Sequence, residues 1–492
     1  MLVRVALPKA GRWTWRTESE DAGLNGKSGT LDVVAPNAAQ LAANPNLRGP
    51  IRIAAGGRHF EHADGTPFFL LASTLWAGNT ARCGLGANAD GPFFEHLADR
   101  KAKGFTAILM QYFHGYGDYP DSPGHRNEGG KPYRDITTKE LNPAHFTSLD
   151  TRMRALWERG FAVAIPATWW GKTKNCVFTP EDARRMSAYC AVRYGAFNAI
   201  WSLGGEYQYA FKDCGWTPAD FTALGGEVQR RNPFKRPLSI HPSGQTSWPP
   251  PHNVLSSLPF HGESWLDHHW LQTGQGEDRL FNIVTRLADN RALQPAMPVF
   301  CSESLYERAQ DAERAYLTRW QVWSAFLNGA AGFGYGAEGL WQFFDPMDAD
   351  GETGKRTQRE VPWREAQAFA GSAQVIHART LLTSLDWWKL TPARERLKVA
   401  GKPNPLPSKT DLTPPQAAVI GDKHWVIYLP RGNAGRIIEL PVKGDWELRW
   451  LNPRTGARTP PHHIATRGAT ILLPDRPVPP EEDWVGTLNR LH

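Results

Sequence analysis

The fold of this chain is decided by residues 68–74, Phe-Phe-Leu-Leu-Ala-Ser-Thr, together with residues 105–111, Phe-Thr-Ala-Ile-Leu-Met-Gln. Both runs are short and apolar, which is typical of strands buried in a sheet. An amphipathic segment from Phe93 to Lys103 lies between them and stops at Gly104, a residue type that commonly ends a helix. A strand, a helix and a second strand in this order predict one unit of a parallel sheet.

The same unit recurs until eight strands can be counted. The further predicted strands cover residues 161–168, 198–203, 237–241, 267–272, 298–303 and 331–336. Further helices are predicted over residues 143–158, 180–194, 218–230 and 309–327, with Thr179 and Thr217 as N-caps of the middle two. A doubly wound sheet is the competing α/β arrangement, but eight units in one series favour closure into a (β/α)8 TIM barrel.

Segments rich in strands flank this barrel. Before it, strands are expected at residues 3–7, 11–17 and 29–34, followed by a linker over residues 37–49. After a helix near residues 363–384, a C-terminal β-sandwich is predicted from strands at residues 417–420, 425–429, 436–440, 446–451 and 469–473. The expected domains are therefore an N-terminal β segment with its linker (1–48), the barrel (49–385) and the sandwich (386–492).

Composition limits the classes to which the protein can belong. Its 492 residues are 41% hydrophobic, which excludes disorder over most of the length. The net charge of +7 is spread without a Lys- or Arg-rich block, so nucleic-acid binding is not expected. No apolar run approaches the ~18 residues of a membrane-spanning helix, so no membrane association is expected either.

The first residues and the cysteines bear on location. The N-terminus lacks the apolar stretch of a signal peptide, so a cytoplasmic location is expected for the chain as it stands. If the natural protein begins upstream of this sequence, a secreted or periplasmic location is expected instead. The cysteines form no Cys-x-x-Cys pair, so reduced thiols are expected at Cys83, Cys176, Cys190, Cys214 and Cys301. The oligomeric state is not determined by the sequence, which is compatible with a monomer.

Two carboxylates fall at predicted strand ends, where the reactive residues of a barrel converge. The fourth strand runs into Leu-Gly-Gly and then Glu206, and the seventh carries Glu303 near its end. A glycosidase needs this pair, with one acid to protonate the leaving oxygen and one carboxylate as nucleophile or base. The alternative interpretation is a pair of rim carboxylates bound to Arg or Lys. Because Glu is rarely buried unless paired or functional, the functional interpretation is favoured.

Aromatic and polar side chains follow the other strands. The chain has 21 Trp, whose flat rings either stack on sugars or fill a core. Four of them fall in the predicted sandwich and are assigned to core or interface: Trp425, Trp446, Trp450 and Trp484. Residues expected to bind a hydroxyl-rich ligand, each of which also fits a structural role, are Trp76, Gln111, His114, Trp169, Trp170, Tyr207, His241, Gln272, Tyr335 and Trp341.

Several rival motifs are absent or incomplete. The sequence has no His-Glu-x-x-His, no Gly-x-Ser-x-Gly and no phosphate-binding Gly-x-x-x-x-Gly-Lys-Ser/Thr. Residues 334–339 fit Gly-x-Gly-x-x-Gly, but Leu-Trp-Gln-Phe-Phe-Asp-Pro follows instead of a helix, which argues against a dinucleotide. His268 and His269 are neighbours on a strand and point to opposite faces, so no metal and no cofactor are expected.

Several of these segments resemble apiosidase-like glycoside hydrolases, family 140 and its relatives. The similar segments are residues 60–76, Arg-Lys-Ala-Lys-Gly-Phe-Thr-Ala-Ile (100–108), Ile-Trp-Ser-Leu-Gly-Gly-Glu (200–206), His-Pro-Ser-Gly (241–244) and residues 335–343. The resemblance covers about residues 50–385. The C-terminal part, with Leu-Asn-Pro-Arg-Thr-Gly, is similar to the small sandwich that usually follows, and residues 1–36 to the last strands of a preceding immunoglobulin-like domain.

The resemblance implies a retaining glycoside hydrolase with Glu206 as acid/base and Glu303 as nucleophile. We expect exo action on a polysaccharide or its side chains, so the expected partner is a carbohydrate. Two departures stand out, because relatives often have Asp where this chain has Glu206, and many barrel glycosidases have Asn where it has Gly205. The sugar accommodated is therefore not assigned. A carbohydrate-binding protein on a degenerate, non-catalytic barrel is the alternative.

Overall fold

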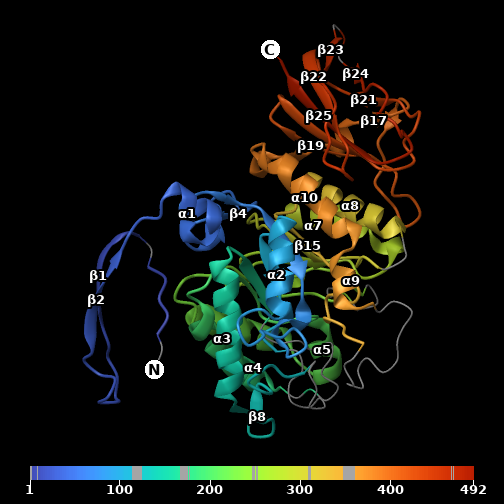
Figure 1. Cartoon of the computed structure of the whole chain (residues 1–492). Coiled ribbons are helices and arrows are strands. Elements are labelled where there is room, and N and C mark those ends of the chain that lie inside the picture. Colours follow the sequence, from blue (N-terminus) through green and yellow to red (C-terminus); the bar gives the residue numbers. More distant parts are fainter. Residues whose placement is uncertain are drawn as a thin grey trace.

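The computed structural model describes residues 3–7, 9–113, 125–166, 176, 178–245, 250, 253–308, 312–346, 361–466, 468 and 470–491. Within these ranges, eight parallel strands form a nearly closed barrel surrounded by helices, and antiparallel sheets follow toward the C-terminus (Figure 1). The predicted barrel with a C-terminal β-sandwich is confirmed. Among the described residues, no helix is long and apolar enough to cross a membrane.

The barrel strands are hydrogen-bonded in the order β12-β11-β10-β7-β6-β15-β14-β13. In chain order they are β6 (Leu70–Thr74), β7 (Ala107–Leu109), β10 (Ala162–Pro166), β11 (Ala199–Ser202), β12 (Leu238–Ser239), β13 (His269–Gln272), β14 (Val299–Glu303) and β15 (Gly332–Tyr335). All the neighbouring pairs are parallel, so the carboxyl ends of the strands point to one mouth.

The gap between β12 and β13 is bridged by hydrogen bonds from the residues around them. Asp267 N–H donates to Leu238 O at 2.9 Å, and the Ser239 hydroxyl donates to His268 O at 2.5 Å. The Asp267 carboxylate in turn accepts from Leu238 N–H at 2.9 Å. These bonds hold the fifth and sixth strands together and so complete the ring.

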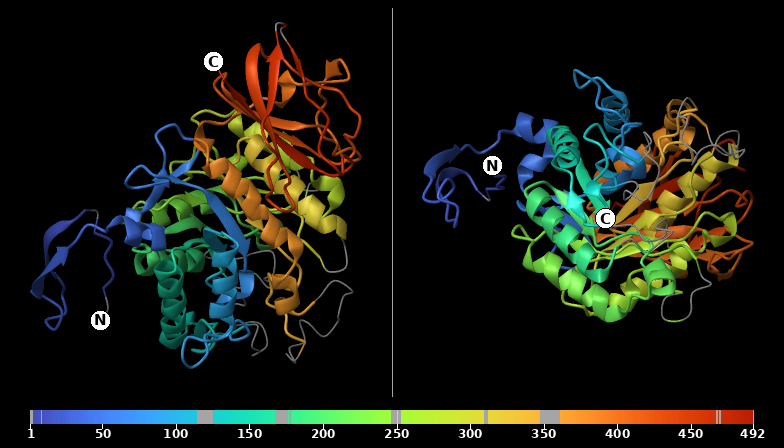
Figure 2. Two further views of the ribbon diagram at one scale, coloured as in Figure 1. Left: turned by 45° about the horizontal axis from the view of Figure 1, so that its top comes forward. Right: turned by 90° about the horizontal axis from the view of Figure 1, so that it is seen from below.

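The helices begin and end close to their predicted bounds. The predicted bounds are met by α3 (Pro143–Glu158), α4 (Pro180–Tyr194) and α6 (Pro218–Arg230), and Thr179 and Thr217 cap the latter two. The others are α2 (Pro92–Ala102), α5 (Gln208–Cys214), α7 (Asn282–Arg291), α8 (Ala312–Leu327), α9 (Trp363–Gln367) and α10 (Ala370–Thr383). Figure 2 shows from two further sides that helices surround the strands.

Short elements complete the barrel. β3 (Ile51–Ile53), β4 (Phe60–His62) and β5 (Pro67–Phe68) form a small antiparallel sheet that precedes the first barrel strand. β8 (Tyr133–Asp135) and β9 (Glu140–Leu141) form a hairpin after the second. Single turns of 3-10 helix span Trp76–Asn79, Leu258–Phe260, Glu277–Arg279, Trp387–Lys389 and Arg394–Arg396.

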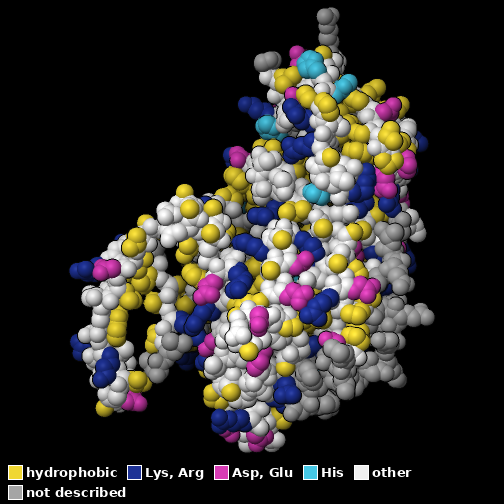
Figure 3. All heavy atoms as spheres, viewed as in Figure 1, with side chains coloured by type: hydrophobic (Ala, Val, Ile, Leu, Met, Phe, Trp, Pro, Cys, Tyr) yellow, Lys and Arg dark blue, Asp and Glu magenta, His cyan; other side chains and the backbone are white. Residues whose placement is uncertain are grey.

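The N-terminal segment differs from its prediction in two places. β1 (Gly11–Arg16) and β2 (Ser28–Val33) form a hairpin, but residues 3–7 form no strand; instead Arg4 bonds to Asp150 of α3. The expected linker is helical, with α1 (Ala38–Ala43) followed by a 3-10 turn (Pro45–Arg48), because Asn37 and Gln40 cap it reciprocally. Figure 3 shows hydrophobic side chains along the hairpin, where Trp15 is 44% exposed.

The C-terminal region consists of two antiparallel sheets around a hydrophobic core. One sheet has the order β16-β19-β20-β25-β22-β23, and the other β18-β17-β21-β24. Their strands are β16 (Thr391–Pro392), β17 (Lys398–Val399), β18 (Lys402–Pro403), β19 (Gln416–Ile420), β20 (His424–Leu429), β21 (Ile438–Leu440), β22 (Gly444–Leu451), β23 (His462–Thr466), β24 (Ile471–Leu472) and β25 (Trp484–Arg490). The predicted burial of Trp425, Trp446, Trp450 and Trp484 is confirmed.

A buried ion pair joins this region to the barrel. Arg319 of α8 donates to both oxygens of Asp483 at 2.8 and 2.7 Å, and both side chains are buried. The Tyr428 hydroxyl donates to the same carboxylate at 3.1 Å. A buried charge is tolerated only when it is paired and hydrogen-bonded, so this contact fixes how the sandwich sits on α8.

The expectation of reduced cysteines is wrong at one pair. Cys176 and Cys214, which are 38 residues apart in the sequence, form a disulfide. The fold brings them together because Cys176 follows the third strand and Cys214 ends α5, after the fourth. Cys83, Cys190 and Cys301 are free and buried, and burial raises their thiol pKa above the usual value.

Candidate active site

Both predicted catalytic carboxylates lie at the mouth of the barrel. Glu206 comes four residues after the end of β11, and Glu303 is the last residue of β14. Glu206 is half-buried, whereas Glu303 is only 7% exposed. The two positions therefore differ both in how the backbone presents the carboxylate and in how far water reaches it.

Glu206 is held in place by its backbone. His241 N–H donates to Gly204 O at 3.0 Å, and Tyr207 N–H donates to His241 O at 3.2 Å, which ties both sides of Glu206 to the segment after β12. Between these anchors Glu206 has a φ of 52°, in the left-handed region that residues with a Cβ rarely occupy. Such strain costs about 1–3 kcal/mol and is typical of functional positions.

A glutamine side chain of fixed orientation contacts Glu303. The Gln275 amide oxygen accepts from Tyr306 N–H at 2.9 Å, and a backbone N–H can only donate. The Gln275 amide nitrogen must therefore face the other way, where it donates to Glu303 Oε1 at 3.1 Å and to Ser304 O at 3.0 Å. The Gln275 amide thus supplies a donor to the carboxylate that cannot turn into an acceptor.

His241 faces the second oxygen of Glu303. Its Nε2 lies 3.2 Å from Glu303 Oε2, and its Nδ1 lies 3.2 Å from the Ser302 hydroxyl. That hydroxyl donates its own proton to Leu271 O at 3.1 Å, so it accepts a hydrogen bond from Nδ1 of His241. The indole rings of Trp76 and Trp270 enclose the imidazole, each in an edge-on arrangement.

Tyr306 also lies beside Glu303. Its hydroxyl faces the negative charge of the carboxylate and accepts from the Trp76 indole N–H at 3.0 Å. Burial and, next, the negative charge of Glu303 raise the pKa of Tyr306 well above its usual value. The phenol therefore keeps its proton and acts as a donor. Trp76 is buried and its indole N–H holds the Tyr306 hydroxyl, and its predicted stacking on a sugar stays a prediction.

The other predicted binding residues have varied surroundings. Gln111 and Gln272 are buried, and Gln272 pairs with Glu303 in the strand register. Tyr207 and Tyr335 are buried and donate their hydroxyls to Ser256 O and to the carboxylate of Glu307. Trp341 is half-buried and donates to Glu338. His114, Trp169 and Trp170 lie outside the described residues. The binding roles of all these residues stay predictions.

Sequence reasoning did not identify Gln275, Tyr306 and Ser302 as part of this site. Tyr306 lies three residues beyond Glu303, so a search one turn past the seventh strand would have found it. Gln275 lies in the loop after the sixth strand, where only Gln272 was singled out. Its role depends on contacts with Tyr306 and Ser304 of the next unit, which no local pattern reveals.

A third carboxylate near the mouth has a structural environment. Glu128 bonds to Arg152 of α3 at 2.7 and 2.9 Å, and the buried Arg152 also donates to the carbonyls of Gly78, Thr80 and Cys83. Burial alone would raise the pKa of Glu128, but the bonds and charge of Arg152 and a bond from Ser148 lower it to about 2. In contrast, the described neighbours of Glu303 include no Arg or Lys within ion-pair distance.

Over the described ranges, no group of three or more His, Cys, Asp or Glu side chains is placed to hold a metal ion.

Known proteins agree with this fold. Residues 54–389 match the family model described as the apiosidase-like catalytic domain, so the chain belongs to that family and is a glycoside hydrolase. A glycoside hydrolase family 5 crystal structure from Bacteroides vulgatus superimposes with a TM-score of 0.70 at 16% identity, covering 91% of this chain and 95% of the other. A second structure, named only as a glycoside hydrolase, gives 0.68 at 17% identity, covering 91% and 98%. At such identities the likeness shows the fold. No curated protein matches the chain with significant similarity.

Proposed function

We propose that this glycoside hydrolase cleaves an O-glycosidic bond in a polysaccharide or its side chains, with Glu303 as nucleophile and Glu206 as general acid/base. The observation that carries the proposal is the environment of Glu303. This carboxylate is almost buried, the Gln275 amide donates to it, and Tyr306 and His241 lie beside it, with no Lys or Arg of the described residues in ion-pair contact.

That environment suits a nucleophile. Hydrogen bonds to a carboxylate favour its charged form, which is the form that attacks a sugar carbon. The bond from Glu303 to the sugar forms as the bond to the leaving oxygen breaks, giving a covalent glycosyl-enzyme. Uncharged donors such as the Gln275 amide hold the oxygens in position while leaving the carboxylate more reactive than an ion pair with Arg would.

Glu206 suits the other role. A general acid/base must give a proton to the leaving oxygen and later take one from water, so it needs access to the mouth. Glu206 is half-buried and its backbone is held at both sides by bonds to His241. With Glu303 as nucleophile, we expect net retention and a carboxyl separation of ~5–5.5 Å, and an inverting enzyme would need ~6.5–9.5 Å.

The substrate is proposed as a carbohydrate whose terminal residue is removed from the end of a chain or branch. The longer Glu206 side chain, where relatives often have Asp, argues that the sugar need not be apiose. A panel of aryl glycosides and of branched pectic fragments tests both points. Release of single sugars supports exo action, and NMR of the first product shows whether the anomeric configuration is retained.

The alternative is a sugar-binding protein on an inactive barrel. Glu303→Gln separates the two, because it removes the nucleophile and preserves the shape of the side chain. The enzyme hypothesis predicts that turnover is lost and sugar binding kept. Turnover equal to that of the unchanged protein would contradict it, and so would the absence of turnover on every substrate of the panel despite measurable binding.

A further inference from the structure

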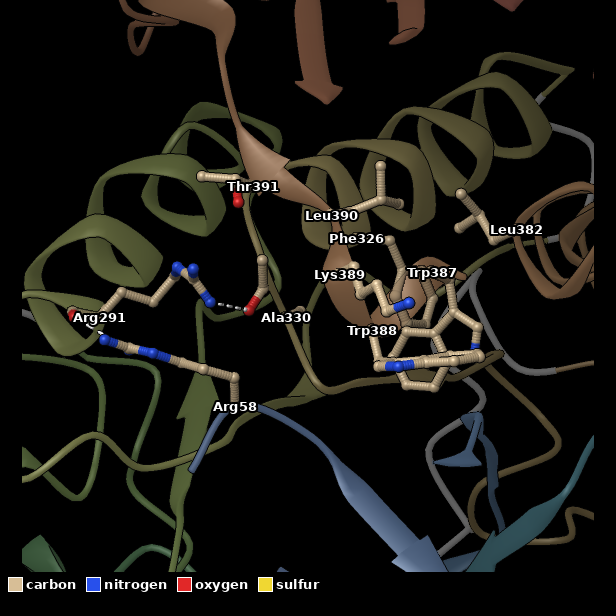
Figure 4. A pocket seen from close by; sticks show the side chains of 11 residues that line it. Arg58, Arg291, Phe326, Ala330, Leu382, Trp387, Trp388, Lys389, Leu390 and Thr391 are labelled. Carbon is tan, nitrogen blue, oxygen red and sulfur yellow. Dashed lines mark hydrogen bonds between the residues drawn. The ribbon is translucent and has the colours of Figure 1, made fainter. Parts of the chain in front are cut away.

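A second cavity lies at the opposite end of the barrel from Glu206 and Glu303. It has a volume of about 260 Å³ and is lined by residues of four segments (Figure 4). Arg58 comes from the turn between β3 and β4, Arg291 ends α7, and Gly329 and Ala330 precede β15. Trp387, Trp388 and Lys389 belong to the segment that joins α10 to β16. The cavity therefore lies where the barrel meets the sandwich.

One wall of this cavity carries two guanidinium groups. Arg58 Nη1 donates to Arg291 O at 3.0 Å, and Arg291 Nη1 donates to Gly329 O at 3.0 Å. Among the described residues, no carboxylate forms an ion pair with either. Burial and, next, the neighbouring charge of Arg58 lower the pKa of Arg291 to about 10. Two half-buried cations held side by side without a counter-ion favour an anion in the cavity.

The backbone is shaped around these groups. Gly329 has a φ of 85°, and a Cβ on it would lie 2.5 Å from Cζ of Arg291, so only glycine lets the guanidinium rest there. Gly57 has a φ of 64°, and a Cβ on it would lie 2.3 Å from Ala296 O. Close backbone packing at Gly329 and Gly57 thus fixes the positions of Arg291 and Arg58.

The other wall is aromatic. Figure 4 shows Trp387 and Trp388 on the side of the cavity opposite Arg58 and Arg291. Trp387 is buried and meets the half-buried Trp388 edge-on, with ring centroids 6.3 Å apart. Lys389 is paired with Asp386 at 2.7 Å, and its ammonium lies over the Trp388 ring, 5.9 Å from the ring centroid. Indole rings opposite guanidinium groups match a ligand that combines an apolar ring surface with a carboxylate.

We propose that this cavity is a second carbohydrate-binding site, which takes one acidic sugar residue of a polysaccharide. The carboxylate of the uronic sugar would accept from Arg58 and Arg291, and its ring would lie against Trp388. A bare anion such as phosphate would use only the first wall. The volume is below the ~300–1,000 Å³ of sites for larger ligands, so it fits a single sugar ring. The site goes beyond the proposed hydrolysis and does not depend on it.

The test measures binding of galacturonic acid trimers to the full-length protein, with the methyl-esterified trimers as a probe of equal size without the charge. Arg58→Met and Trp388→Ala should each weaken binding of the acidic trimers about tenfold or more, since Arg and Trp dominate such contacts. Arg230→Met on the exposed face of α6 and Trp15→Ala in the hairpin are matched controls and should leave the Kd unchanged.

Three results would overturn the proposal: equal affinity in all four variants, equal affinity for acidic and esterified trimers, and inorganic phosphate displacing the trimers as effectively as free galacturonate does. Melting temperatures of all variants show whether they fold. Arg58→Lys, which keeps the charge but not the forked donor, should weaken binding less than Arg58→Met does. Because Glu303→Gln should bind the acidic trimers as the unchanged protein does, failure of this site and failure of the proposed hydrolysis are distinguishable.

Discussion

The ends of β11 and β14 present a carboxylate to the same mouth in two different ways. Glu303 still belongs to its strand, the Gln275 amide donates to it, and Tyr306 and His241 lie beside it. Glu206 lies beyond its strand, with a left-handed backbone and a half-buried side chain. One group is fixed through its side chain and the other through its backbone.

This difference matches the two tasks of a glycosidase. A nucleophile gains from donors that hold its oxygens at the reacting carbon, since every misplacement raises the barrier. An acid/base must exchange protons with the leaving group and with water, so it gains from a fixed backbone and a carboxylate that water can reach. Glu128, bound to a buried Arg152, shows what a structural carboxylate in the same barrel looks like.

The largest effect is expected from Glu303→Gln. The amide cannot attack the sugar, so kcat should fall by roughly 10⁴-fold or more, with KM changed far less. Steady-state kinetics on the best aryl glycoside measures this change. With Glu303→Ala, added azide should give a glycosyl azide of inverted configuration. A variant within tenfold of the unchanged enzyme would mean that Glu303 is not the nucleophile.

Glu206→Gln should cost less, and its effect should depend on the leaving group. General acid catalysis contributes typically 10²–10⁴-fold, but an acidic phenol departs without a proton. We expect a large loss on alkyl or sugar leaving groups and a small one on dinitrophenyl glycosides, measured as kcat/KM. Equal losses across this series would assign Glu206 a different role.

Tyr306→Phe tests the donors around Glu303. The substitution removes the hydroxyl that faces Glu303 and that accepts from the Trp76 indole N–H, so kcat should fall about 10–100-fold with KM nearly unchanged. Tyr428→Phe is the matched control, because its buried hydroxyl also bonds to a carboxylate, that of Asp483, far from the mouth. A similar loss of kcat in both variants would point to general destabilisation instead.

The smallest effect on activity is expected from Glu128→Gln. The pKa of Glu128 is about 2 in the fold, below its usual value near 4.5, so its ionised form stabilises the protein above that value. This stability is lost as the pH falls from about 4.5 toward 2. The variant should flatten the decline of Tm over this window and keep near-full activity at pH 7. Glu140→Gln, at an exposed pair with Arg134, should leave the decline as it was.

Local signals in the sequence account for what was predicted well. Thr179 and Thr217 mark the starts of two helices. Each is followed by Pro and by an acidic residue at the third helical position, so the whole signal lies within four consecutive residues. Short apolar runs likewise located the ends of the strands that carry Glu206 and Glu303 to within a few residues. Residues 3–7 have a strand-like pattern, but a strand also needs a neighbour, and β1 pairs with β2 alone. The domain boundaries at residues 48 and 385 stay predictions.

The sequence by itself determined the order of strands and helices, the barrel class and the two carboxylates, because apolar periodicity and capping act over a few residues. Only the tertiary structure decided what surrounds those carboxylates. Gln275, Tyr306 and His241 meet Glu303 from different strand ends, and Cys176 meets Cys214 across two units. Such contacts depend on the closure of the barrel, which places distant residues within hydrogen-bond reach, and a local pattern does not show which of them meet.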